Sequence, residues 1–564
     1  MNIFSKLNIL YRVLKWRFTW NKRDIDYKQV VEGNDKFISA RQAVKFIKDN
    51  DVCMVAGLAG NQRISVLSWA LAERFQKENH PQNLTLITPG GQGGRGRVPG
   101  TLEEWALKGL VSTLVSAHHE TYRAFLELAD ENGVELQCIP QGLIAVLVEA
   151  QSKGEKYLSS ETGIGTFCDP RVSGSCVVDP TGKNAQLIEV DGDKLKYHLP
   201  QIDVALFNAP SADKEGNIYV ENSATICESK YAALAAHKNG GKVIANVGQI
   251  IEKNEDNIYI PADLVDAVVV NPITEQTGVY PHLKYSKHLT VHPESDLDYG
   301  IEMIRLVNRI AGITPKRGKK DFVLARLGAK VLTEAISKGA YINIGTGLPE
   351  EVCYNLYKNN CLDDIQFFTE AGAIGGIPAP GVFFGAAAAP EQIISSPEIF
   401  HQAYSQLDAT ILGFLQVDSK GDVNSSRKRA GAQGFVGPGG FMDFTSAAKN
   451  VVFTGSWMKG GKIKITKDKV TIVKKGTPKF IEKVQEITFN GDEGLRKNQQ
   501  VFFATHVGVF VLAKEGITLK QVMPGIDIQK DILDFSPMKI LVADDCTEVD
   551  RSIISGERFS LEVK

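Results

Sequence analysis

The chain has 564 residues, of which 43% are hydrophobic, 23% charged and 8% aromatic. This composition is typical of a folded globular protein and excludes a disordered, collagenous or coiled-coil chain. Sixty-four Lys and Arg residues against sixty-six Asp and Glu residues leave a net charge of -2. No chain-wide positive field would therefore bind nucleic acid or an anionic membrane, and we expect no nucleic-acid partner.

The N-terminal segment, residues 1–37, is predicted to be a basic amphipathic extension that precedes the first domain. Its first 23 residues contain six basic residues and no acidic one. Seven apolar side chains fall on one helical stripe: Ile3, Phe4, Leu7, Leu10, Tyr11, Leu14 and Phe18. This pattern predicts a basic amphipathic helix that contacts a membrane surface or serves as a targeting segment. Because Ile9, Val13, Trp16 and Trp20 lie on the opposite face, packing on the protein's own body or on a sister subunit is an equal alternative.

The eight cysteines form no Cys-x-x-Cys pair and have no His at ligand spacing. This distribution indicates buried thiols in a reducing compartment and argues against a zinc site or a disulfide framework. No run of eighteen apolar residues occurs, so we expect no membrane span. The prediction is a cytoplasmic protein, or a protein of the mitochondrial matrix if residues 1–23 are a targeting peptide.

A long internal repeat is visible as four landmarks that occur in the same order in both halves. Residues 40–75 match 328–359, and residues 84–91 match 365–372. The spacing from Asp203 to Gly216 equals that from Asp408 to Gly421, and the segment ending at Gly248 matches the segment ending at Gly455. Strand and helix patterns alternate through both copies, which predicts two homologous α/β domains with mainly parallel sheets. We place the first domain at residues 38–314, a linker at 315–321 and the second domain at 322–564.

The two copies differ at one position with chemical consequences. The first copy has Pro89 after Thr88, whereas the second has Glu370 after Thr369. A carboxylate at the carboxyl end of a buried parallel strand lies where open α/β sheets bind ligands. A capping or turn carboxylate is the alternative interpretation, but the occurrence of Glu370 in only one copy favours a functional role.

Two other segments could complete a site around Glu370. The glycine-rich stretch 434–441 could direct backbone N–H groups at a developing oxyanion, or could be only a tight loop. Gln141, in the turn 139–142, offers a neutral amide donor, although a surface turn is the default for such a tetrapeptide. The chain has no Gly-x-Ser-x-Gly elbow, which argues against a serine hydrolase. The turn Gly57-Leu-Ala-Gly60 follows a strand and opens a helix, but it lacks the three-glycine pattern and no clear ribose-binding acid follows, which argues against NAD binding there.

Together these motifs resemble the family I coenzyme A transferases of the acetate, propionate and 3-oxoacid group, over residues 38–550. The resemblance implies two NagB/RpiA-like domains with the active site in the cleft between them. It implies Glu370 as the catalytic nucleophile and Gln141, Gly439 and Gly440 as groups that stabilise the oxyanion. It also implies a coenzyme A (CoA) binding role for Gly345, Thr346, Gly347 and Gly372. Thr-Glu-Ala-Gly departs from the Ser-Glu-Asn-Gly of the succinyl-CoA:3-oxoacid enzymes, which disfavours succinyl-CoA as donor.

The resemblance further implies that CoA passes from a short-chain acyl-CoA to a free carboxylic acid by a ping-pong mechanism through a glutamyl-CoA thioester. With an ordinary pKa of about 4.3, Glu370 would be ionised at pH 7 and could attack without a helper base. We expect no metal and no cofactor, since the CoA thioester is a substrate, and a homo-oligomer of two or four chains. Short-chain fatty acid or ketone body metabolism is the expected setting. An acyl-CoA hydrolase on the same scaffold and a non-catalytic sugar-phosphate-binding module remain alternatives.

Overall fold

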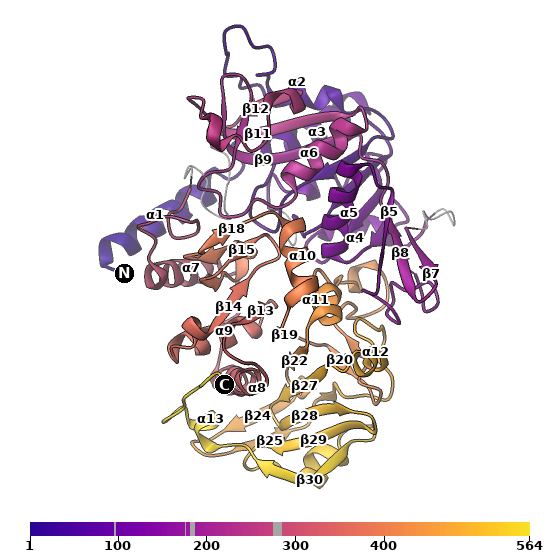
Figure 1. The fold of residues 1–564 in the computed structure, drawn as a ribbon, viewed down its shortest axis with the longest axis vertical. Helices are drawn as coiled ribbons and strands as arrows, with labels where there is room; N and C mark the ends of the chain where they lie inside the picture. The colour runs from indigo at the N-terminus through magenta and orange to yellow at the C-terminus, as the bar shows by residue number, and fades with distance from the viewer. Residues whose placement is uncertain (95–97, 175, 181–186, 274–284) are drawn as a thin grey trace.

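The computed structural model describes residues 1–94, 98–174, 176–180, 187–273 and 285–564. It contains two large β-sheets, each covered by helices. One sheet is built from the N-terminal half of the chain and the other from the C-terminal half, and the halves lie one above the other along the long axis in Figure 1. The mixed α/β architecture with two mainly parallel sheets confirms the predicted fold class.

The first sheet has the strand order β12-β11-β9-β1-β2-β3-β4-β6, with β10 paired to β9. All neighbours are parallel except the pairs that involve β6 and β10. The strands are β1 (Val52–Val55), β2 (Leu84–Thr88), β3 (Val111–Ser116), β4 (Glu135–Cys138), β6 (Cys176–Val178), β9 (Val204–Asp213), β10 (Ile218–Tyr219), β11 (Lys242–Ile251) and β12 (Ala267–Val270).

Helices cover both faces of the first sheet, as parallel sheets require. One apolar core lies under α5 and α6, and a second core on the opposite face lies under α2, α3 and α4. The helices are α2 (Ala40–Ala43), α3 (Ser65–Glu78), α4 (Arg123–Asp130), α5 (Gln141–Lys153) and α6 (Ser229–Lys238). A small antiparallel sheet of β5 (Tyr157–Ser160), β8 (Lys194–His198) and β7 (Ile188–Asp191) lies at the side of this half (Figure 1).

The second sheet has the order β18-β15-β14-β13-β19-β22-β27-β28-β29-β30, with parallel pairing from β14 to β27. Its strands are β13 (Ala340–Ile344), β14 (Ile365–Phe368), β15 (Ala373–Ile374), β18 (Gln392–Ile393), β19 (Ala409–Leu412), β22 (Asn450–Thr454), β27 (Gln500–Thr505), β28 (Gly508–Ala513), β29 (Gly516–Val522) and β30 (Leu541–Glu548). Its helices include α8 (Lys319–Ala335), α9 (Pro349–Lys358), α10 (Ser396–Gln406), α11 (Phe441–Ala447), α12 (Gly491–Arg496) and α13 (Arg551–Ser555).

The internal repeat is confirmed by the strand order. The series β12-β11-β9-β1-β2 of the first sheet corresponds, strand for strand along the chain, to β27-β22-β19-β13-β14 of the second. The matched aspartates also have the same role. Asp203 Oδ2 accepts from the amide of Val52 at 2.8 Å, and Asp408 Oδ2 accepts from the amide of Tyr341 at 2.9 Å. Each carboxylate therefore satisfies a backbone donor at the start of the central strand of its own sheet.

Helix α7 (Leu297–Ala311) belongs by its packing to the second half. Met303, Ile304 and Val307 lie in the same apolar core as the second sheet. Asn308 fixes the helix further, because its Nδ2 donates to the carbonyl of Pro380 at 2.9 Å and its Oδ1 accepts from the amide of Val382 at 3.1 Å. The chain has thus reached the second half before the predicted linker at 315–321, whose last three residues form the first turn of α8. The other predicted domain boundaries stay predictions.

The N-terminal helix α1 (Ile3–Thr19) packs beside α7 through Ile9, Val13 and Trp16 (Figure 1). Among the described residues, no helix is long and apolar enough to cross a membrane. The seven cysteines whose side chains the structure describes are unpaired, and all but Cys546 are buried.

Candidate active site

Glu370 lies in the tight turn that follows β14. The hydroxyl of Thr369 donates to the carbonyl of Gly385 at 2.6 Å and accepts from the amide of Ala373 at 3.2 Å. Gly372 has a φ of +97°, and a Cβ there would lie 1.8 Å from the carbonyl oxygen of Ile394. Only glycine fits that position, so the Thr-Glu-Ala-Gly sequence folds into one defined turn that fixes the backbone of Glu370.

The carboxylate of Glu370 is almost completely removed from solvent, since the residue is only 7% exposed. Burial raises the pKa of Glu370 to about 7, and the nearby charge of Asp443 adds to the rise. The expectation of an ordinary carboxylate, fully ionised at pH 7, is therefore wrong. The motif around Glu370 did not reveal this, because the burial comes from contact with segments distant in the sequence.

The glycine-rich loop 434–441 of the second half is bonded to the first half through backbone groups. Val436 accepts from the amides of His119 at 2.8 Å and Glu120 at 2.9 Å, and the amide of Gly439 donates to the carbonyl of Ala117 at 2.9 Å. Gly437 has a φ of +79°, and a Cβ there would lie 2.5 Å from the same carbonyl. Position 437 therefore requires glycine, because the backbones of the two halves approach too closely there for a side chain.

Gln141, this loop and Glu370 meet at the junction of the two halves. Gln141 is the first residue of α5 and is 3% exposed, and its amide donates to the carbonyl of Gly439 at 3.1 Å. A Cβ at Gly439 would lie 3.7 Å from Oε1 of Gln141, and a Cβ at Gly440 would lie 3.4 Å from Cγ of Glu370. The structure thus brings together residues that are far apart in the sequence. Glu370 lies 229 positions after Gln141, and Gly440 lies 299 positions after it.

The two predicted glycine amides differ in availability. The amide of Gly439 already donates to Ala117, whereas the amide of Gly440 has no acceptor among the described residues. Within the described part of the chain, the side-chain amide of Gln141 makes no hydrogen bond either. Gly440 and Gln141 can therefore donate to a ligand beside Glu370, and Gly439 instead holds the backbone of Gln141 in place.

Asp443 and Tyr404 are site residues that the sequence analysis did not identify. Asp443 lies in the first turn of α11 and is fully buried. It accepts from the amide of Gly142 at 3.0 Å and from the hydroxyl of Tyr404 at 2.7 Å. Burial raises the pKa of Asp443 to about 7, although these hydrogen bonds oppose the rise. A carboxylate of the second half therefore caps the first-half helix that begins with Gln141.

Glu228 makes the reciprocal connection, from the first half to the second. It precedes α6, and its carboxylate interacts with the side chain of Ser396, the first residue of α10, and with the amide of Gly57 at 3.5 Å. Burial raises the pKa of Glu228 to about 7. The neighbouring Cys227 packs with Leu58 against Ala371, the residue after Glu370. The first-half turn at residues 57–60 therefore supports the turn that carries Glu370.

The predicted CoA-binding turn, residues 345–347, connects β13 to α9. Because β13 and β14 are adjacent and parallel, this turn and Glu370 lie at the same edge of the second sheet. Thr346 is exposed and a Cβ at Gly347 would meet no atom within 4 Å, so a ligand can approach here. Gly372, by contrast, is buried against Ile394, and the structure shows it as a turn residue.

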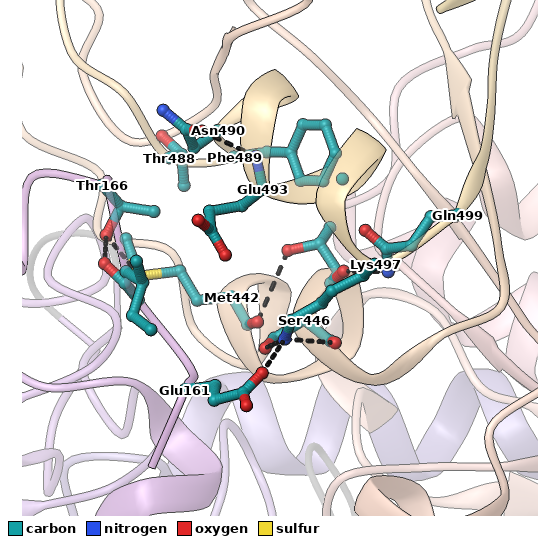
Figure 2. Close-up of a pocket in the computed structure, with 14 residues that line it drawn as sticks. Glu161, Thr166, Met442, Ser446, Thr488, Phe489, Asn490, Glu493, Lys497 and Gln499 are labelled. Atoms are coloured by element: carbon teal, nitrogen blue, oxygen red, sulfur yellow. Dashed lines mark hydrogen bonds and ion pairs between the residues drawn. The ribbon is translucent and has the colours of Figure 1, made fainter. Parts of the chain in front are cut away.

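Figure 2 shows a small cavity lined by both halves of the chain, next to α11. Glu161 from the first half pairs with Lys497 at 3.3 Å, and Lys497 also donates to Oγ of Ser446 at 2.8 Å. The cavity has a volume of about 30 Å³ and none of the predicted site residues lines it. It therefore marks a contact between the two halves, separate from the predicted site.

A strand-terminal glutamate is thus buried where two duplicated α/β halves meet, beside a glycine loop that also contacts Gln141. Carboxylates are among the groups that serve as nucleophiles in enzymes. A family model described as coenzyme A transferase matches residues 37–271. The chain is 32% identical to the caffeate CoA-transferase of Acetobacterium woodii over 93% of this chain and 99% of that one. It is 30% identical to the acetate CoA-transferase YdiF of Escherichia coli K12, over 90% and 93% respectively. The chain belongs to the coenzyme A transferase family, of family I type, and it is a CoA-transferase enzyme.

The solved structures agree with this assignment. The apoenzyme of the acyl-CoA transferase YdiF from Escherichia coli O157:H7 matches with a TM-score of 0.80 and 28% identity, covering 94% of this chain and 98% of that one. A second structure of that protein, a thioester complex with CoA, matches with a TM-score of 0.78 and the same identity, covering 92% and 95%. These relatives are bacterial, and they give no support to the mitochondrial alternative.

Proposed function

We propose that this enzyme transfers CoA from an acyl-CoA to a free carboxylic acid through a glutamyl-CoA thioester on Glu370. The observation that carries the proposal is the position of Glu370, buried at the junction of the two halves beside Gln141 and Gly440. Support also comes from a relative solved as a thioester complex with CoA.

The reaction begins when a carboxylate oxygen of Glu370 attacks the thioester carbonyl carbon. The C–S bond breaks, CoA thiolate leaves, and an acyl-glutamyl anhydride forms. The thiolate then attacks the glutamyl carbonyl carbon and expels the acyl group as a free carboxylate, leaving the glutamyl-CoA thioester. A second carboxylate reverses these steps and departs as its own CoA thioester. No proton is transferred, so no histidine is needed.

Both addition steps place negative charge on a carbonyl oxygen. The side-chain amide of Gln141 and the backbone amide of Gly440 are the donors that can stabilise it, and the loss of one such donor costs about 100-fold in rate. The pKa of Glu370, raised to about 7, leaves roughly half of this carboxylate ionised at neutral pH. The ionised fraction is a stronger nucleophile than a solvated carboxylate because its hydration shell is lost.

We propose that CoA enters along the carboxyl edge of the second sheet, over residues 345–347, while Gly372 shapes the turn of Glu370. The relatives are named for caffeate and acetate. Because these two acids differ, the acid that this enzyme uses has to be determined by experiment. A short-chain aliphatic acid is our proposal for the acceptor, and a homo-oligomer our proposal for the assembly. Ketone body metabolism stays a prediction from the sequence.

An isotope-exchange assay tests transfer against hydrolysis. The enzyme is mixed with acetyl-CoA and ¹³C-labelled acetate, and with matched propionyl and butyryl pairs, and the acyl-CoA is analysed by mass spectrometry. If the enzyme transfers CoA, the label should appear in the acyl-CoA while the total amount of thioester stays constant. The Glu370→Gln variant should lose this exchange. The matched control Glu391→Gln, at an exposed glutamate of the same half, should exchange normally. Release of free CoA without label incorporation in any pair would indicate hydrolysis and overturn the proposal.

A further inference from the structure

Helix α1 has two apolar faces, and only one of them is covered. Ile9, Val13 and Trp16 face α7 and are between 4% and 8% exposed. The other face carries seven large apolar side chains that are 36% to 81% exposed: Ile3, Phe4, Leu7, Leu10, Tyr11, Leu14 and Phe18. Seven of the eighteen exposed large hydrophobic residues of the described chain therefore lie on this one helix. We call these seven residues the outer stripe.

Basic residues border the outer stripe on both sides. At about 100° per residue, Lys6 and Arg17 project along one border of the stripe, and Lys15 and Arg12 along the other. Lys22 and Arg23 follow the helix, and no acidic residue precedes Asp24. The net charge of the whole chain is -2, so this positive charge is local to the N-terminal segment.

An apolar stripe with basic residues on both borders is the pattern of helices that bind anionic lipid surfaces. Apolar side chains enter the boundary between headgroups and acyl chains, and the long stems of Lys and Arg let their charges reach the lipid phosphates. A helix of 17 residues that lies in the plane of the surface does not need to span the bilayer. The helix is already held to the body by Ile9, Val13 and Trp16, so the outer stripe can face the lipid without unfolding.

A second copy of the chain is a poorer occupant of the outer stripe. Self-association of α1 about a twofold axis would bring the same face of each helix together. The basic borders would then face each other, and α1 carries no acidic residue to pair with them. Lysine is also depleted in the cores of protein interfaces.

We propose that α1 attaches this enzyme peripherally to an anionic lipid bilayer through the outer stripe and its basic borders. Figure 1 shows α1 along the outside of the molecule beside α7, whereas β14 and α11, which flank the proposed catalytic residues, lie near its centre. The outer stripe includes none of the proposed catalytic residues, and the proposal does not depend on the identity of the substrate.

Sedimentation with vesicles tests the attachment directly. The full-length protein is mixed with phosphatidylcholine vesicles and with vesicles that also contain phosphatidylglycerol, over a series of salt concentrations. We expect binding to the anionic vesicles at least tenfold stronger than to the neutral ones, weakened by salt. Phe4→Glu/Phe18→Glu should lose at least tenfold in binding, and Lys6→Glu/Lys15→Glu should lose about fivefold or more per cation.

Two controls separate attachment from other roles of α1. Val473→Glu/Val542→Glu replaces exposed apolar residues elsewhere and should bind as the parent does. The α1 variants should retain the CoA-transfer rate in solution, because the substituted side chains are exposed and belong to none of the proposed site residues. Equal sedimentation of parent and α1 variants, or no preference for anionic vesicles, would overturn the proposal. A drop in molar mass of the α1 variants by light scattering would also overturn it, because the outer stripe would then belong to an interface between copies.

Discussion

The carboxylate of Asp443 lies 3.0 Å from the amide nitrogen of Gly142 and thereby connects the two halves of the chain at the start of α5. Tyr404 holds the other oxygen of the same carboxylate at 2.7 Å. Gln141 is the residue immediately before Gly142, so the bond from Gly142 to Asp443 helps to position the proposed oxyanion donor. Its charge also raises the pKa of Glu370.

Replacing Asp443 by Asn should lower kcat by about tenfold or more and leave the KM for acyl-CoA nearly unchanged. The helix N-terminus loses its anionic cap, and the acid limb of the pH–rate profile should move to lower pH because Glu370 loses a neighbouring negative charge. Tyr404→Phe keeps the carboxylate and serves as the milder control. A fall in stability with no change of the pH profile would show that Asp443 is only structural.

Gly440→Ala should impair catalysis because the added methyl group would overlap a neighbouring side chain in the site. The added Cβ would lie 2.7 Å from Cε2 of Phe444, so Phe444 or the loop backbone must move, and it would also touch Cγ of Glu370 at 3.4 Å. We expect the rate of acyl exchange to fall by about tenfold or more. Gly413→Ala is the matched control, since a Cβ there meets no atom within 4 Å. Similar exchange rates in the two variants would contradict the placement of Gly440 beside the reacting carboxylate.

The pH dependence of transfer follows from the raised pKa of Glu370. Only the ionised carboxylate can attack, so kcat/KM should rise with pH up to about 7 and then level off. An unperturbed glutamate would give a midpoint near 4.3 instead. Initial rates between pH 5 and 9, at acyl-CoA concentrations well below KM, measure the midpoint. A profile that is flat from pH 5 upward would mean that Glu370 is not buried as the structure shows.

The sequence predicted those parts of this molecule that depend on local pattern. The repeat, the parallel sheets and Glu370 at the end of β14 all follow from strand and turn signals within each half. Asp443 escaped notice because its partner Gly142 lies about 300 positions away in the other half, and Tyr404 escaped notice because it acts through Asp443. The ionisation of Glu370 was mispredicted for the same reason, since its burial is a tertiary effect. The different availability of the amides of Gly439 and Gly440 depends on the path of the loop, which glycine content alone does not define.

Glu228→Gln should change how stability depends on pH. Burial raises the pKa of Glu228 from 4.5 to about 7, so the protonated form contributes stability that is complete below the unfolded pKa and is lost as pH rises through about 7. The Gln side chain cannot ionise, so the variant does not lose this stability as pH rises. Its free energy of unfolding relative to the parent should therefore be higher at pH 8 than at pH 5.5, as measured by urea denaturation. The same difference at both pH values would argue against a buried, titrating Glu228.

The most direct test of the account is covalent trapping on Glu370. Intact-protein mass spectrometry after mixing with acetyl-CoA should show an adduct with the mass of CoA less one water, and borohydride should convert it to a reduced residue on the peptide that contains Glu370. Glu370→Gln should show neither product. An adduct on another residue, or an unmodified parent protein that nevertheless exchanges acyl groups, would contradict the assignment of Glu370 as the nucleophile.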